Sequence, residues 1–217
     1  MSTPAVTSYI AVGGTHSWLP GRRTGEWYHE DSRWSLYMKS QRFAPIIGDG
    51  RPFTWSTQLD GLLFWRKGAT WAAAGDALFA WIVPPLAPLM RVPPSQTNLI
   101  VHSHALQVAL WACALGLKVH TLTSIAGPVR SDMADVAALA RPNIRFWQHL
   151  YSDRSDRMQW LGEFGDGALG IVRQHPLADR NVSMPKAGHS GILNDPQWFV
   201  LWPDLLDNIR ASAPEAA

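Results

Sequence analysis

The chain has 217 residues, a length that suits one domain with its own hydrophobic core. Hydrophobic residues make up 47% and charged residues 17%, which excludes a disordered chain, because such chains combine few apolar residues with high net charge. The net charge of +2 comes from 19 basic and 17 acidic residues without long runs, so we expect no nucleic-acid partner. Twelve tryptophans are the unusual feature, and seven of them lie between Trp18 and Trp81.

The location of the protein is predicted from three features of the sequence. The first residues lack a basic region followed by an apolar run, so they do not resemble a secretory signal. The single cysteine, Cys113, cannot form an intramolecular disulfide, and its apolar neighbours indicate a buried thiol. Residues 92–117 are uncharged and long enough to span a bilayer, but their prolines and polar side chains favour a buried strand and helix. We therefore expect a cytoplasmic protein without an integral membrane segment.

The first half of the chain predicts regular elements separated by irregular stretches. An apolar run at residues 9–12 ends at two glycines and is typical of a central strand. A helix is expected at 29–41, with Asp31 or Ser32 near its start, and another at 69–83, where two prolines end it.

The second half alternates cleanly between strand and helix. Strands are expected at 98–102, 118–126, 143–151 and 180–184, and helices at 104–115, 131–140 and 195–211. This alternation is typical of a parallel sheet covered by helices on both faces. We therefore predict the α/β class, with a mostly parallel central sheet flanked by helices, in a single domain of residues 1–217. A Trp-rich irregular segment spans about 19–97.

One predicted strand meets an apolar helix at a single serine, Ser103. A sharp turn there carries the side chain to the carboxyl edge of the sheet, where open α/β sheets bind ligands. The next backbone N–H, that of His104, then lies at a helix N-terminus, whose partial positive charge suits a developing oxyanion. Taken alone, the serine is more simply explained as a helix N-cap.

Two further segments favour a catalytic interpretation. His189 lies between two glycines, after the last short strand and before the last helix. The segment after the preceding strand supplies two carboxylates, Asp153 and Asp156. The chain order of serine, acid and histidine, each at the end of a successive strand, is the order of an α/β-hydrolase triad.

The sequence therefore resembles the α/β-hydrolase family, most of all its small lipase- and esterase-like members. The resemblance runs from about Tyr9 to the closing helix, although residues 19–97 match only loosely, and it implies that fold. The chain is too short for a large separate cap domain. The chain departs from the family's G-x-S-x-G turn, because Val101 and Ala105 stand where the glycines would be. Small residues relieve crowding in this strained turn, so Val101 is the larger departure.

The resemblance also implies roles for particular residues. Ser103 would be the nucleophile and His189 the general base and then acid, with a carboxylate orienting the imidazole. Asp156 is favoured as that carboxylate, because in small lipase-like relatives the acid precedes a short helical segment like the one that follows it. Asp153 is the alternative.

The loop after the first strand resembles the family's oxyanion loop. By position, the backbone N–H groups of Thr15 and His104 would hold the oxyanion, and His16 and Trp18 would line the substrate pocket. Most of the other tryptophans between residues 19 and 97 are expected in the core, because Trp buries a large apolar area. His102 is expected to pack beneath the turn. Two histidines at His102 and His104 can begin a zinc site, but their side chains should diverge, so no metal is expected.

The function predicted from these residues is hydrolysis of a carboxylic ester, lipid-like esters and thioesters included, with no metal or organic cofactor. The substrate is expected to be a small molecule with an apolar acyl group, because two or three of the seven tryptophans from Trp18 to Trp81 are expected in the pocket and small-molecule sites are mainly apolar. One alternative is a non-catalytic binding or scaffold protein of the same fold, which Val101 favours. An amidase or acyltransferase is the other, since a triad serves those reactions equally.

Overall fold

A computed structural model describes residues 6–14, 27, 32–46, 53, 55, 68–83, 97–152, 173–184, 187–194 and 196–211. Within these ranges, six parallel strands form one sheet in the order β2-β1-β3-β4-β5-β6. The strands are β1 (Thr7–Val12), β2 (Phe43–Pro45), β3 (Asn98–His102), β4 (Val119–Ile125), β5 (Ile144–Tyr151) and β6 (Arg180–Ser183). The predicted α/β class with a parallel central sheet is confirmed.

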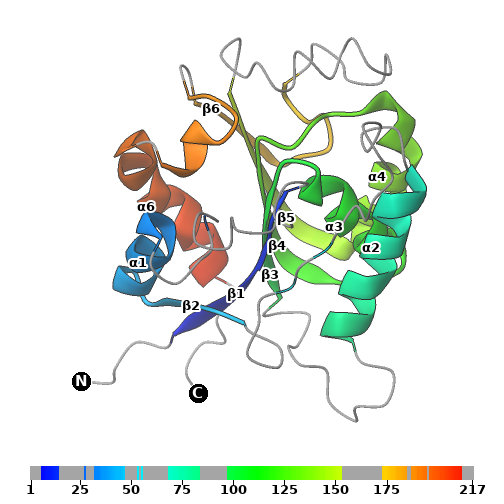
Figure 1. Cartoon of the computed structure of the whole chain (residues 1–217), viewed down its shortest axis with the longest axis horizontal. Helices are drawn as coiled ribbons and strands as arrows, with labels where there is room; N and C mark the ends of the chain where they lie inside the picture. The colour runs from blue at the N-terminus through cyan, green and yellow to red at the C-terminus, as the bar shows by residue number, and fades with distance from the viewer. Residues whose placement is uncertain are drawn as a thin grey trace.

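Helices cover both faces of the sheet. The α-helices are α1 (Arg33–Ser40), α2 (Gly68–Ile82), α3 (Ala105–Ala114), α4 (Ala134–Ala140) and α6 (Pro196–Arg210), and the 3-10 helices are η4 (Ser131–Met133), η5 (Arg141–Asn143) and η6 (Gly191–Leu193). Helices α1 and α6 lie on one face and α2, α3 and α4 on the other, which gives three layers (Figure 1). None of the helices that the structure describes is long and apolar enough to cross a membrane.

The helix starts show where local sequence signals hold and where they fail. Of Asp31 and Ser32, the two residues expected near the start of this helix, Ser32 caps α1, and its Oγ accepts a hydrogen bond of 3.0 Å from the Ser35 N–H. The predicted helix at 131–140 instead begins with the 3-10 turn η4. The Asp132 carboxylate is bound there by the Arg130 guanidinium rather than by the helix N-terminus. Strand β2 was not predicted from the sequence, because three residues ending in a proline are too few to show a hydrophobic periodicity.

Two hydrophobic cores lie on opposite faces of the sheet because side chains alternate along each strand. In β3, Leu99 and Val101 pack into the core beneath α2, α3 and α4. Ile100, between them, packs into the core beneath α1 and α6. Val101 is fully buried in the first of these cores, together with Leu106 of α3. Val101 therefore fits before the turn because its side chain packs in the same core as the helix that follows, α3.

The tryptophans from the irregular segment pack where the sequence predicted. Trp34, Trp55 and Trp71 are buried core residues, and Trp27 and Trp81 pack against the two cores. Trp18 and Trp65 lie outside the described residues. The expectation that most of these tryptophans are core residues is therefore confirmed for those that the structure describes.

Candidate active site

The turn between β3 and α3 holds Ser103 in a strained backbone conformation. Its φ of 58° lies in the left-handed region, which costs a residue other than glycine about 1–3 kcal/mol. The surroundings enforce it: the Ser103 N–H donates to the Ile125 carbonyl at 2.9 Å, and the Leu106 N–H donates to the Ser103 carbonyl at 3.1 Å. The sharp turn predicted at Ser103 is confirmed. The residue at the N-cap position of α3 is His104, so Ser103 is not the helix cap.

Ser103 and His189, far apart in sequence, meet at the carboxyl edge of the sheet. Their Oγ and Nε2 atoms are 2.9 Å apart, and 86 positions separate them in the chain. Ser103 is only 7% exposed, so the hydroxyl is sheltered from bulk solvent. A neutral His189 with an unprotonated Nε2 accepts this hydrogen bond from the serine O–H. The pair therefore has the distance over which a histidine can take a serine proton.

The loop after β1 packs directly against this turn. A Cβ added at Gly14 would lie 3.0 Å from the Ser103 Cβ and 3.2 Å from the His102 carbonyl oxygen, which is tighter than nearly all Cβ contacts in proteins. The loop is also anchored from below, where the buried Trp55 indole N–H donates to the Gly13 carbonyl at 2.8 Å. Sequence reasoning did not predict this hydrogen bond, because an indole donor leaves no signal in a sequence pattern.

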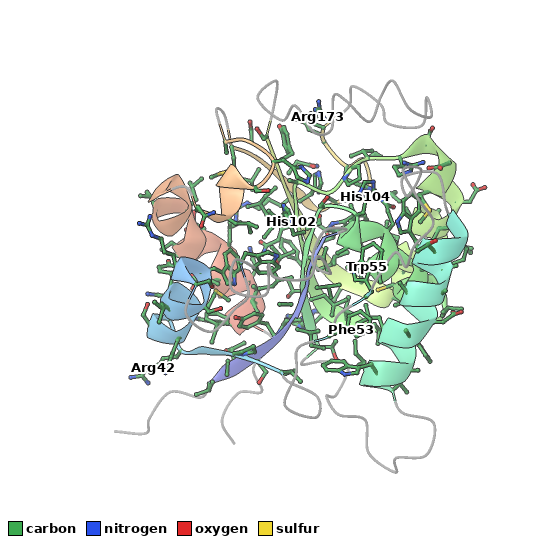
Figure 2. The ribbon with its side chains drawn as sticks, in the orientation of Figure 1. Arg42, Phe53, Trp55, His102, His104 and Arg173 are labelled. Carbon is green, nitrogen blue, oxygen red and sulfur yellow. The ribbon has the colours of Figure 1, made fainter. Side chains whose placement is uncertain are left out.

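The two histidines that flank Ser103 contact different partners. The His102 Nε2 lies 3.1 Å from the backbone carbonyl oxygen of His189, and the two rings are 5.0 Å apart. The His104 ring stacks on Trp71, with centroids 5.4 Å apart and an angle of 12° between the planes. Figure 2 labels both residues near the carboxyl end of the sheet. The predicted divergence of the two side chains is confirmed, and His102 has a specific partner rather than packing alone.

The segment after β4, from Gly127 to Asp132, packs against the start of α3, and we call this segment the wall. The Gln107 amide donates to the Pro128 carbonyl at 2.9 Å, and a Cβ added at Gly127 would lie 2.6 Å from the Leu106 Cδ2. The buried Arg130 guanidinium lies 4.7 Å from the Trp71 ring centroid. Because Asp132 pairs with Arg130 through two hydrogen bonds of 2.8 and 2.6 Å, this buried cation is already balanced within the wall.

Several predicted site residues lie outside the described residues. These are the candidate acids Asp156 and Asp153, the oxyanion donor Thr15, and the pocket residues His16 and Trp18. Their roles therefore stay predictions. Among the ranges that the structure describes, no three side chains of His, Cys, Asp or Glu converge as metal ligands would.

A second serine–histidine pair lies on the neighbouring strands β4 and β5. The Ser124 Oγ is 2.7 Å from the His149 Nδ1, and the Trp147 indole N–H donates to the same Oγ at 2.9 Å. The Nε2 of His149 lies 3.0 Å from the Arg173 carbonyl, and because a carbonyl oxygen only accepts, Nε2 carries the proton and donates it. In the neutral ring Nδ1 is then unprotonated and accepts the hydrogen bond from the Ser124 O–H. Sequence reasoning missed this network, because both residues sit inside predicted strands.

The electrostatics of this second pair keep His149 neutral. Burial, with a smaller contribution from the nearby His175, lowers the pKa of His149 to about 3. Burial also lowers the pKa of His175 to about 4. The hydrogen bond to the Arg173 carbonyl opposes the shift in His149 but does not overcome it. This pair is therefore a neutral structural network at ordinary pH.

The comparison with known proteins rests on structure alone. No protein-family model and no curated protein matches the sequence. A dienelactone hydrolase-like promiscuous phosphotriesterase from metagenomic libraries is similar with a TM-score of 0.52 and 12% identity, over 97% of this chain and 88% of that one. The esterase domain of a Rhodothermus marinus protein is similar with a TM-score of 0.50 and 14% identity, over the same shares, 97% and 88%. The sheet order, the helices on both faces and these likenesses show that the chain has the α/β-hydrolase fold.

Proposed function

We propose that the protein is a serine hydrolase that cleaves carboxylic esters through an acyl-enzyme. The observation that carries the proposal is the hydrogen bond of 2.9 Å between Ser103 and His189 at a strained strand-to-helix turn. Strained backbone that the surroundings enforce is concentrated at functional sites. The esterase activity named for one structural relative belongs to the same reaction class and supports the proposal.

The reaction follows from the roles of the two residues. The Ser103 Oγ attacks the ester carbonyl while the His189 Nε2 takes the hydroxyl proton, and the carbonyl electron pair moves to the oxygen. The N–H groups of His104 and Thr15 stabilise this oxyanion, and the positive end of α3 adds to the effect. When the tetrahedral intermediate collapses, the C–O bond to the alcohol breaks and His189 returns the proton to the departing oxygen. Water, deprotonated by His189, then releases the acid and restores Ser103.

The remaining partner in this mechanism is a carboxylate that orients the imidazole. We assign this role to Asp156, with Asp153 as the alternative, because both follow β5 in the chain order that a triad needs. Such a carboxylate sets the productive tautomer of the histidine and stabilises the imidazolium that forms during attack.

Labelling by a fluorophosphonate tests the proposal directly. We expect intact protein to gain one phosphonyl group, mapped by peptide mass spectrometry to Ser103, and the Ser103→Ala protein to remain unlabelled. Ser124→Ala is the matched control and should label normally. A folded protein that is not labelled would indicate the non-catalytic binding or scaffold alternative. Faster cleavage of amides, or transfer of the acyl group to an added alcohol, would indicate an amidase or acyltransferase.

The substrate class that we propose is an ester with an apolar acyl group. The support is the tryptophan-rich segment that precedes β3, together with the apolar lining usual in small-molecule sites. For p-nitrophenyl esters, kcat/KM should rise about fourfold per methylene from acetyl, because each buried methylene contributes about 0.8 kcal/mol to transition-state binding. A thioester series with the same acyl groups compares the two leaving groups. A flat profile from acetyl to octanoyl would contradict the apolar pocket.

A further inference from the structure

We propose that His102 is a positioning residue, which fixes the backbone of His189 and thereby the distance between the His189 imidazole and Ser103. The proposal rests on the proposed function of that pair. It starts from the contact of 3.1 Å between the His102 Nε2 and the His189 carbonyl oxygen. His102 and Ser103 are consecutive residues, so this contact ties the candidate base to the same turn that holds the candidate nucleophile.

The register of β3 places His102 on the correct face for this contact. Side chains two apart share a face, so His102 lies on the side of Ile100 and away from Val101. Ile100 belongs to the core that also contains Met184, Ala187 and Leu193, the buried residues on either side of His189. The face that His102 shares is therefore the face on which the segment carrying His189 is packed.

The His189 segment depends on hydrogen bonds rather than on packing at its glycines. A Cβ added at Gly188 or Gly191 would meet no other atom within 4 Å, so neither position is enclosed. The Ser152 hydroxyl donates to the Ala187 carbonyl, and His102 contacts the carbonyl of His189 itself. Since glycine also gives the backbone extra conformational freedom, the contact with His102 adds to the hydrogen bond of 2.9 Å from the Gly191 N–H to the Gly188 carbonyl in limiting movement at the histidine.

The chemistry of the contact defines the protonation of His102. A carbonyl oxygen only accepts hydrogen bonds, so the His102 Nε2 must carry a proton and donate it. The opposite edge of the ring faces the loop after β1, because a Cβ added at Gly14 would lie 3.3 Å from the His102 Nδ1. His102 thus lies between that loop and the His189 segment. A donor at Nε2 is therefore the property that a functional substitute has to retain.

Two amide substitutions distinguish a hydrogen-bond donor at the position of Nε2 from a side chain that is merely polar. In His102→Gln the side-chain N–H₂ lies four bonds from the Cα, as Nε2 does in histidine, whereas in His102→Asn it is one bond short. We expect His102→Gln to keep a rate of ester hydrolysis near that of the wild type. A displacement of about 1 Å can cost roughly 100-fold in rate, so we expect a loss in kcat approaching that size for His102→Asn, with little change in KM. Equal rates for the two folded variants would overturn the proposal.

Imidazole ¹⁵N NMR tests the same proposal without turnover. The His102 signals should show a protonated Nε2, and the His189 Nε2 signal should move when Ser103→Ala removes its hydrogen-bond donor. His102→Asn should move the His189 signal in the same direction, and His102→Gln should leave it in place. An unchanged His189 signal in folded His102→Asn would overturn the positioning role even in an active enzyme. If the NMR signals move as expected but fluorophosphonate does not label the protein, the positioning role of His102 would stand and the proposed hydrolase function would be wrong.

Discussion

Ser103 and Ser124 each hydrogen-bond a histidine at similar distances, 2.9 and 2.7 Å, but in different surroundings. Ser103 occupies a strained turn at the edge of the sheet, and its partner lies in a loop. Ser124 and His149 lie within adjacent strands, where Trp147 and Arg173 use the remaining hydrogen-bonding positions. A short Oγ–N distance is therefore not sufficient for catalysis. A catalytic pair also needs access for a substrate and a histidine that can accept a proton.

The largest expected effect distinguishes Ser103 from Ser124, because one alanine variant should lose activity and the other should lose stability. Ser103→Ala should lower kcat for short p-nitrophenyl esters by about 1,000,000-fold while the protein stays folded. Ser124→Ala should keep its activity per folded molecule, because Ser124 lies outside the proposed site. It should lose about 1–3 kcal/mol in the free energy of unfolding, since the Trp147 N–H and the His149 Nδ1 lose a buried partner. A folded Ser103→Ala protein that hydrolyses these esters at the wild-type rate would contradict the proposed difference between the two serines.

A second difference concerns what holds each histidine. The Nε2 of His149 donates to a backbone carbonyl, whereas we assign a carboxylate to His189. Asp156→Asn should therefore lower kcat by about 10,000-fold through the wrong tautomer, and Asp153→Asn should have a small effect. The measurement is kcat for both variants after far-UV circular dichroism has shown that they are folded. The opposite order would move the role to Asp153, and two small losses would mean that neither carboxylate orients His189.

The neutral network predicts how stability depends on pH. The pKa values of His149 and His175 are lowered in the folded state, to about 3 and about 4, so below pH of about 6.5 the unfolded chain binds more protons. Stability is therefore present above that pH and is lost as the pH falls from about 6.5 towards 4. Each histidine contributes about 1.4 kcal/mol per pH unit in this window. Urea unfolding at several pH values measures the slope, which His149→Gln should reduce by about 1.4 kcal/mol per pH unit.

The smallest expected effect concerns backbone strain, and it should reverse sign between the two serines. Ser103→Gly should be more stable than Ser103→Ala by about 1 kcal/mol, because glycine adopts a positive φ without the steric penalty. Ser124→Gly should be less stable than Ser124→Ala by about 0.5–1 kcal/mol, because glycine weakens a strand. Thermal unfolding of the four variants gives both differences. The same sign at both positions would show that the turn at Ser103 relaxes when its hydroxyl is removed.

The chain order of the elements followed from the sequence because their signals are local. The apolar run of β3 was predicted with the bounds that the structure shows, and the closing helix begins with Pro196 in its first turn as expected. The turn at Ser103 was predicted where strand and helix patterns meet. The contact between Ser103 and His189 could be predicted from the strand order along the chain, because the carboxyl ends of parallel strands share one edge of the sheet.

Only the tertiary structure decided the contacts that hold these elements in register. The Trp55 indole reaches the Gly13 carbonyl across 42 positions of sequence, and the His102 imidazole reaches the His189 carbonyl across 87. Each contact ends on a backbone carbonyl, a group that every residue carries, so no residue pattern marks the acceptor. Strand β2 likewise exists because Phe43 pairs with Thr7 of β1, and three residues have no period of their own. Apart from β2, local periodicity determined which segments are strands and helices, whereas long-range hydrogen bonds determined which side chains surround Ser103.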